Sequence, residues 1–129
     1  MGKHVFLSFV AEDLDAVNLF RGQAKNRNSA LVFADYSVKT PYNSTNAAYI
    51  RSQITEKIRD ASVTICLIGP STAASDWVAW EIEKSVQLGN KVIGVKLYST
   101  VNCPTPAALT AARATIHEWK ITDVVGAIG

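Results

Sequence analysis

Short apolar runs alternate along the chain with segments in which apolar residues recur every three or four positions. The runs are rich in β-branched and aromatic side chains, so each predicts a β-strand. The periodic segments between them predict amphipathic helices. Strands are expected at residues 4–9, 30–34, 62–68, 91–97 and 115–119, and helices at 11–25, about 46–60, 75–87 and 107–114.

Strands that alternate with helices are typical of a parallel sheet covered by helices. Residues 62–68 are apolar at nearly every position, as expected for a central strand that is buried on both faces. We therefore expect one α/β domain over residues 1–129, with a five-stranded parallel sheet of the flavodoxin-like type and helices on both faces. Ligands of such sheets bind beyond the carboxyl ends of the strands, here the loops after Phe9, Ala34 and Ile68.

Composition and charge argue against several classes of partner: nucleic acids, metals and membranes. The 129 residues are 48% hydrophobic and 19% charged, which is enough to build a core without disulfides or metals. The net charge of +2 is spread along the chain, so we expect no nucleic-acid partner. Cys66 and Cys103 have no partner at zinc-ligand spacing, and we expect two reduced thiols and no metal. No apolar run is long enough for a membrane span or a signal peptide, so we expect a cytoplasmic protein without membrane contact.

Several protein classes that share a flavodoxin-like sheet are disfavoured, because the loops after the strands lack the motifs that these classes need. A phosphate-accepting receiver domain needs an aspartate after its third strand, but Gly69 and Pro70 follow residues 62–68. The loop after the first strand, residues 10–13, contains acids and lacks the glycines of a phosphate-binding loop. No GxxxxGK[ST] motif occurs, which excludes a P-loop kinase. A receiver-like domain that binds a ligand without phosphorylation remains as a weaker alternative.

The segment SDWVAWEIEKS in the helix at 75–87 is the most informative one for chemistry. Trp77 and Glu81 are four residues apart, so they share one helix face. A catalytic carboxylate there would face solvent near the strand ends, where it could hold a ribose diol or stabilise a developing cation while the indole stacks on a base. The alternative is an exposed glutamate that pairs with Lys84 or Lys57. A second, apolar face can pack on the sheet and consists of Val78, Ile82 and Val86.

The order of motifs along the chain resembles that of TIR domains. The motifs are HVFLSF, LVFAD, SVTICLIGPSTAASDWVAWEIEKS and GNKVIGVKL, with a looser match at IHEW. More narrowly, the chain is similar to the small TIR-like proteins of the Thoeris anti-phage defence system over roughly residues 3–97. The segment WVAWEIEKSVQLGNKVIGV carries this similarity most specifically.

The resemblance implies an enzyme that cleaves the bond between nicotinamide and ribose in NAD, an NAD glycohydrolase or ADP-ribosyl cyclase. NAD would then be the substrate and not a cofactor. Thoeris relatives cyclise the ADP-ribose product into a signal that acts on a separate effector protein, and some TIR enzymes complete their site by self-association. Glu81 takes the place of the catalytic glutamate of the family.

The same resemblance suggests four substrate-binding residues. Ser8 and Phe9, at the end of the first strand, correspond to positions that line the nicotinamide pocket of TIR enzymes, although core packing is an equal alternative for Phe9. Asp35 ends the second strand, where it would orient ribose or cap a turn. Trp77 would stack on the nicotinamide or adenine ring, or serve as a structural aromatic. Trp80 is expected to pack.

A second function class stays open. Residues 36–45 are poor in the glycines and acids that many TIR enzymes carry in the corresponding loop. A non-catalytic TIR module that assembles with partners would keep the WxxxE helix for packing alone. The retained glutamate favours the enzyme.

Overall fold

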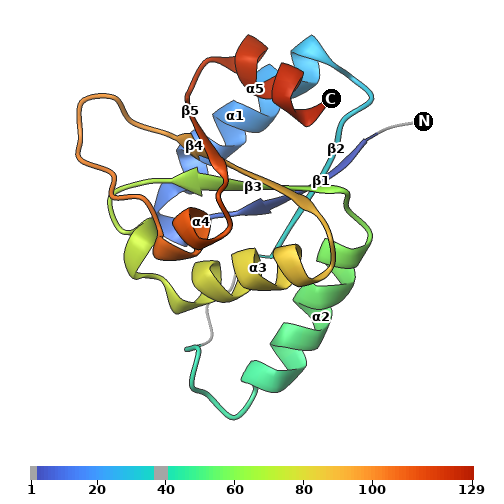
Figure 1. Ribbon diagram of the computed structural model, residues 1–129, viewed down its shortest axis with the longest axis vertical. Helices are drawn as coiled ribbons and strands as arrows, with labels where there is room; N and C mark the ends of the chain where they lie inside the picture. Colours follow the sequence, from blue (N-terminus) through green and yellow to red (C-terminus); the bar gives the residue numbers. More distant parts are fainter. Residues whose placement is uncertain (1–2, 37–40) are drawn as a thin grey trace.

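The computed structural model describes residues 3–36 and 41–129, and in them a parallel sheet of five strands in the order β2-β1-β3-β4-β5. Part of the loop at 36–45 therefore lies outside the described residues. The sheet confirms the expected fold class (Figure 1). The strands are β1 His4–Ser8, β2 Val32–Asp35, β3 Val63–Ile68, β4 Lys91–Lys96 and β5 Thr115–Glu118.

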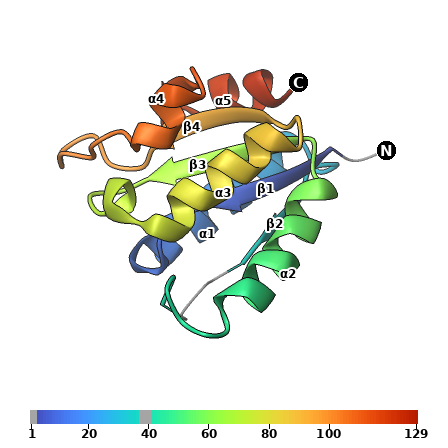
Figure 2. The same ribbon diagram turned by 60° about the horizontal axis from the view of Figure 1, so that its bottom comes forward.

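Helices cover both faces of the sheet, as expected. α1 and α5 lie on one face, whereas α2, α3 and α4 lie on the other (Figures 1 and 2). The helices are α1 Leu14–Arg27, α2 Ala47–Arg59, α3 Asp76–Gln87, α4 Ala107–Ala111 and α5 Ile121–Ile128. Two short 3₁₀ turns, η1 Ala11–Asp13 and η2 Thr72–Ala74, precede α1 and α3.

The two faces divide the side chains of β1 by the alternation of an extended strand. Val5 and Leu7 join the core under α1 and α5, while Phe6 belongs to the core under α2. Every residue of β3 is buried, which confirms its predicted central position. Strand order reverses between β1 and β3, because β1 leads outward to β2 at one edge and β3 leads to β4 toward the other. A crevice at the carboxyl ends of β1 and β3 is the expected ligand site of such a sheet.

Some details differ from the sequence expectations. The last element expected from the sequence was the strand at 115–119, whereas the structure has a further helix after it, α5. Its apolar positions 121, 124, 125 and 128 have helical spacing, so a signal for this helix was present. In the first helix Val17, Phe20 and Ala24 are buried, whereas Leu14 and Leu19 are 40% and 58% exposed.

The apolar face predicted for α3 is also corrected in part. Val78 and Ile82 are buried against the sheet, but Val86 is 50% exposed. Ser85 takes the place facing the sheet because it finds a hydrogen-bond partner there, Thr64 of β3. No described helix is both long and apolar enough to cross a membrane. Both cysteines are free thiols, as predicted.

Candidate active site

A small pocket opens at the carboxyl end of β1, between the loop after this strand and the first turns of α3. Its volume is about 160 Å³. The lining residues come from the loops after β1 and β2 and from α3 with its preceding residue. They are Phe9, Val10, Ala11, Glu12, Tyr36, Ser75, Trp77 and Glu81.

The carboxylate of Glu81 is held from β1. Ser8 ends this strand with its side chain completely buried, and its Oγ donates a 2.7 Å hydrogen bond to Oε1 of Glu81. Glu81 is only 3% exposed, so the expectation of a solvent-facing group was wrong. The helix face that it shares with Trp77 turns toward the end of β1 and not toward water. Ser8, Glu81 and Trp77, three of the predicted site residues, are thereby brought to one place.

The alternative considered for Glu81, an ion pair with Lys84 or Lys57, is not present in the described part of the chain. Nζ of Lys84 donates to Oε1 of Gln87 and lies 5.7 Å from the centre of the Trp80 ring. Arg21 and Asp35 form the one ion pair recorded among residues 3–36 and 41–129. Glu81 is thus buried, and within residues 3–36 and 41–129 no cation is paired with it.

A buried polar network fixes α3 on the sheet. Nδ2 of Asn90 donates to Oγ1 of Thr64 over 3.3 Å, and the Thr64 and Ser85 hydroxyls lie 2.8 Å apart. The Ser85 hydroxyl in turn donates to the main-chain carbonyl of Glu81 over 2.8 Å. These bonds replace water contacts for each buried group, and they define the position of α3 along β3. The position of the Glu81 carboxylate follows from that of the helix.

The beginning of α3 is equally well defined. Oγ of Ser75 accepts a hydrogen bond from the main-chain N–H of Val78, which makes Ser75 the N-cap of the helix. Gly89 follows the helix with a φ of +83°, a conformation that glycine adopts without strain. Both ends of α3 therefore follow from local sequence.

Burial dominates the electrostatics of the pocket. It raises the pKa of Glu81 from 4.5 to about 8. The hydrogen bond from Ser8 lowers this pKa, and the negative charge of Asp35 raises it. Burial, together with the nearby Glu81, also raises the pKa of Cys66, so this thiol stays protonated. At neutral pH the Glu81 carboxyl at the base of the pocket is therefore mostly protonated.

Aromatic side chains form the wall nearest α2. The Trp77 ring is half-buried and meets the Tyr42 ring edge-on, with 5.0 Å between the ring centres. Trp80 lies 6.2 Å from Trp77 in a second edge-on contact, and it packs against the core under α2 as predicted. Trp77 thus has one aromatic neighbour on each side and still lines the pocket.

The remaining two predicted residues, Phe9 and Asp35, differ in whether they reach the pocket. Phe9 lines the pocket and also packs against the core under α1, so both roles considered for it are compatible with its position. Asp35 is paired in register with Leu7, which faces α1. Its Oδ1 is 2.5 Å from Arg21 of α1, and it is not among the residues that line the pocket.

Sequence reasoning did not identify Tyr36 or Ser75 as pocket residues. Both lie in loops that follow strand ends, and the general rule for ligand sites in this fold pointed to those loops without selecting a side chain. Glu12 was noted only as an acid in the loop after β1. In the structure it lines the pocket and accepts a 2.9 Å hydrogen bond from Ser71 Oγ. The described residues include no cluster of side chains suited to a metal ion.

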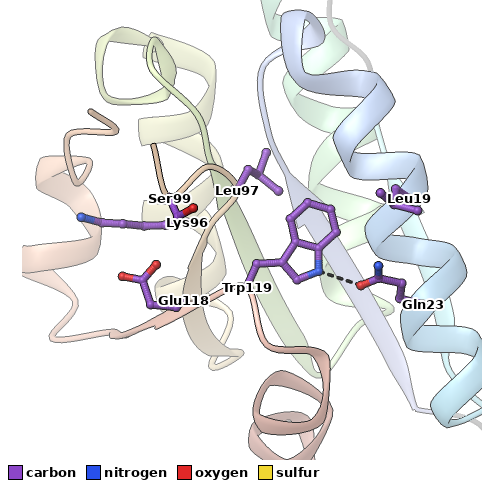
Figure 3. A pocket seen from close by; sticks show the side chains of 7 residues that line it. All are labelled: Leu19, Gln23, Lys96, Leu97, Ser99, Glu118 and Trp119. Atoms are coloured by element: carbon purple, nitrogen blue, oxygen red, sulfur yellow. Dashed lines mark hydrogen bonds between the residues drawn. The ribbon is translucent and has the colours of Figure 1, made fainter. Parts of the chain in front are cut away.

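A second, larger pocket of about 380 Å³ lies at the ends of β4 and β5 beside α1. Figure 3 shows the Trp119 indole pointing toward α1, where its N–H donates to Oε1 of Gln23 over 2.9 Å. Among the residues that line this larger pocket, Glu118 supplies the one carboxylate, and its side chain is exposed. The smaller pocket combines a buried acid with a half-buried indole, and we therefore regard it as the candidate active site.

Sheet order, the reversal between β1 and β3, and a WxxxE helix beside the end of β1 together define a TIR-like domain. The family described as "Thoeris protein ThsB, TIR-like domain" matches residues 6–102, and the chain belongs to this family. It is 35% identical over 102 residues to a protein of Bacillus cereus (strain MSX-D12) named "Putative cyclic ADP-D-ribose synthase ThsB1". The match covers 75% of this chain and 53% of the relative, so the chain spans about half the length of that protein.

Solved structures agree on the fold. The TIR domain of the Toll-related receptor TRR-2 from Hydra magnipapillata superposes with a TM-score of 0.62 at 15% identity, over 96% of this chain and 90% of that one. The TIR domains of the activated Roq1 resistosome give a TM-score of 0.50 at 17% identity, over 98% of this chain and 69% of that one. At these identities the similarity establishes the fold alone.

Proposed function

We propose that this protein cleaves the bond between nicotinamide and ribose in NAD and closes the remaining ADP-ribose into a cyclic isomer. NAD is then its substrate, and no other cofactor is required. The observation that carries the proposal is the Glu81 carboxyl, held by Ser8 at the base of a pocket beside Trp77. The name of the Bacillus cereus relative, a cyclic ADP-D-ribose synthase, supports the same chemistry.

The chemistry requires a negative charge next to the anomeric carbon. As the glycosidic bond breaks, its electron pair leaves with nicotinamide, and positive charge develops on the ribose ring. An ionised Glu81 stabilises that positive charge, and because the carboxylate is buried, little water screens the attraction between the two charges. Nicotinamide is already a cationic leaving group in NAD, so departure needs no proton from the protein.

The raised pKa of Glu81 is compatible with this role. The cationic nicotinamide ring of the bound substrate is an opposite charge, which favours the ionised carboxylate. Substrate binding would therefore lower the pKa of Glu81 from its value of about 8. Trp77 supplies a flat surface for a ring of the dinucleotide at the same place.

A nucleophile from the adenosine half then attacks the anomeric carbon to form the cyclic product, while attack by water gives linear ADP-ribose. The cyclic product would act on a separate effector protein in anti-phage defence. Self-association would be a further requirement if a second copy completes the pocket.

Mass spectrometry of NAD incubated with the purified protein tests the proposal. The incubation should include high protein concentration and lysate from phage-infected cells. We expect nicotinamide and a cyclic ADP-ribose species, both lost in Glu81→Gln. Glu83→Gln is the matched control, because Glu83 lies on the same helix with an exposed side chain. If NAD is not consumed under any condition, the non-catalytic interaction module becomes the better assignment.

A further inference from the structure

The active-site pocket is too small to enclose a dinucleotide. Its volume of about 160 Å³ is below the roughly 300–1,000 Å³ of pockets that enclose drug-sized ligands. It can hold the nicotinamide and part of its ribose beside Glu81. The diphosphate that follows must cross the rim of the pocket, where its negative charges meet the side chains that surround the opening.

Two sides of the rim are unfavourable for a diphosphate. On the side of η1, Glu12 carries a carboxylate that is held in place by Ser71. At the first turn of α3, Ser75 already caps the helix and Asp76 adds a negative charge. Acids at a helix N-terminus neutralise the positive end of the helix dipole, so these sides offer little attraction to an anion.

The side nearest α2 has the opposite character. The guanidinium of Arg51 lies over the Tyr42 ring, 5.3 Å from its centre, and Tyr42 contacts Trp77 of the pocket wall. One aromatic ring therefore separates this cation from the wall. The first turn of α2 contains no acid, which leaves the positive end of the helix on the same side.

Arg51 is also available for a ligand. In the part of the chain that the structure describes, no carboxylate is paired with its guanidinium. Stacking on Tyr42 limits the movement of the group and leaves the N–H donors at its edge free to bind. A guanidinium of this kind suits two adjacent phosphate oxygens, because its donors match their spacing.

Two other cations near the pocket, within the described residues, are already engaged. Arg21 is paired with Asp35 on the α1 side of the sheet, and its guanidinium lies 6.0 Å from the Phe9 ring centre. Lys84 lies over Trp80 and donates to Gln87, farther along α3 than Glu81. The charges around the opening thus favour a position of the diphosphate beside Tyr42.

We propose that Arg51, oriented by Tyr42, binds the diphosphate of the dinucleotide at the α2 side of the pocket. This assignment rests on the proposed function, since it takes NAD and its ADP-ribose product as the ligands. It divides the substrate into a nicotinamide ribose at Glu81 and a diphosphate at Arg51, with Trp77 between them. Arg51 is then a binding residue that contributes to affinity and not to the bond-breaking step.

Isothermal titration calorimetry with ADP-ribose tests the assignment without requiring turnover. Loss of a charge-assisted hydrogen bond to phosphate should weaken binding about 10- to 100-fold in Arg51→Gln. Arg51→Lys should recover part of the affinity. Arg59→Gln is the matched control, because it removes the same charge from an exposed site at the other end of α2. Thermal unfolding of each variant shows whether it is folded.

A second ligand separates phosphate recognition from general loss of the pocket. Nicotinamide riboside lacks phosphates, so Arg51→Gln should bind it as the unchanged protein does. Equal ADP-ribose affinity in Arg51→Gln and the unchanged protein would overturn the assignment, as would a failure of the unchanged protein to bind ADP-ribose. If ADP-ribose binds through Arg51 and NAD is not consumed, the proposed reaction fails while the diphosphate site stands.

Discussion

Replacement of Glu81 by glutamine should make the protein more stable at high pH while removing activity. In the unfolded chain this carboxyl ionises near its ordinary pKa of 4.5, and in the folded protein burial delays ionisation until about pH 8. Between these values the unfolded state binds fewer protons than the folded one, so stability falls as pH rises. Below pH 4.5 the group is neutral in both states and has no such effect.

The size of this effect follows from the two pKa values. One pKa unit corresponds to about 1.4 kcal/mol, so ionisation of Glu81 destabilises the fold by about 5 kcal/mol above pH 8 and about 3 kcal/mol at pH 7. Glutamine has the same size and does not titrate, and its amide oxygen can accept the hydrogen bond from Ser8. The variant should therefore gain stability relative to the unchanged protein as pH rises.

Urea unfolding at pH 4, 5, 6, 7 and 8 measures the difference. We expect the free energies of unfolding of Glu81→Gln and the unchanged protein to diverge steadily with pH and to reach several kcal/mol at pH 8. Glu83→Gln should show no comparable divergence, because Glu83 is exposed. If the difference in free energy of unfolding between Glu81→Gln and the unchanged protein stayed constant from pH 4 to pH 8, Glu81 would ionise alike in the folded and unfolded states, and the reasoning from burial would be refuted.

Of three further changes, two test the surroundings of the Glu81 carboxyl and one tests the packing of Gly69 against Asp13. Ser8→Ala removes a hydrogen bond that lowers the pKa of Glu81, so a carbon-13 NMR titration of this carboxyl should give a midpoint above that of the unchanged protein; an unchanged midpoint would contradict the bond. Asp35→Asn removes a negative charge that raises the same pKa, and the midpoint should move down, a direction opposite to that of Ser8→Ala. Gly69→Ala would place a Cβ against the carboxylate of the buried Asp13, so thermal unfolding should show a loss of about 1–3 kcal/mol in stability. An equally stable variant would mean that Asp13 moves freely.

Only those features of the site that depend on local sequence pattern could be predicted from the sequence. The four-residue spacing of Trp77 and Glu81 fixes their common face on any helix, and the structure keeps it. The direction of that face depends on the packing of α3. Because Val78, Ile82 and Ser85 turn toward the sheet, Glu81 is carried to the end of β1 and becomes buried.

Asp35 shows the same limit on a strand. Its position at the end of β2 could be predicted from the run LVFAD, but its direction could not. The register with β1 places Asp35 beside Leu7, on the face covered by α1, where Arg21 pairs with it. A shift of one residue in that register would have turned the carboxylate to the other face.

The sequence by itself determined the five strands, the helices from α1 to α4, their order and the central position of β3, because periodicity and continuous apolar runs are local properties. Only the tertiary structure decided which side chains meet. The hydrogen bond between Ser8 and Glu81 joins residues 73 positions apart, and Arg51 reaches the pocket wall through Tyr42. Such contacts depend on strand register and helix packing, which arise from the burial of the whole core and not from any one segment.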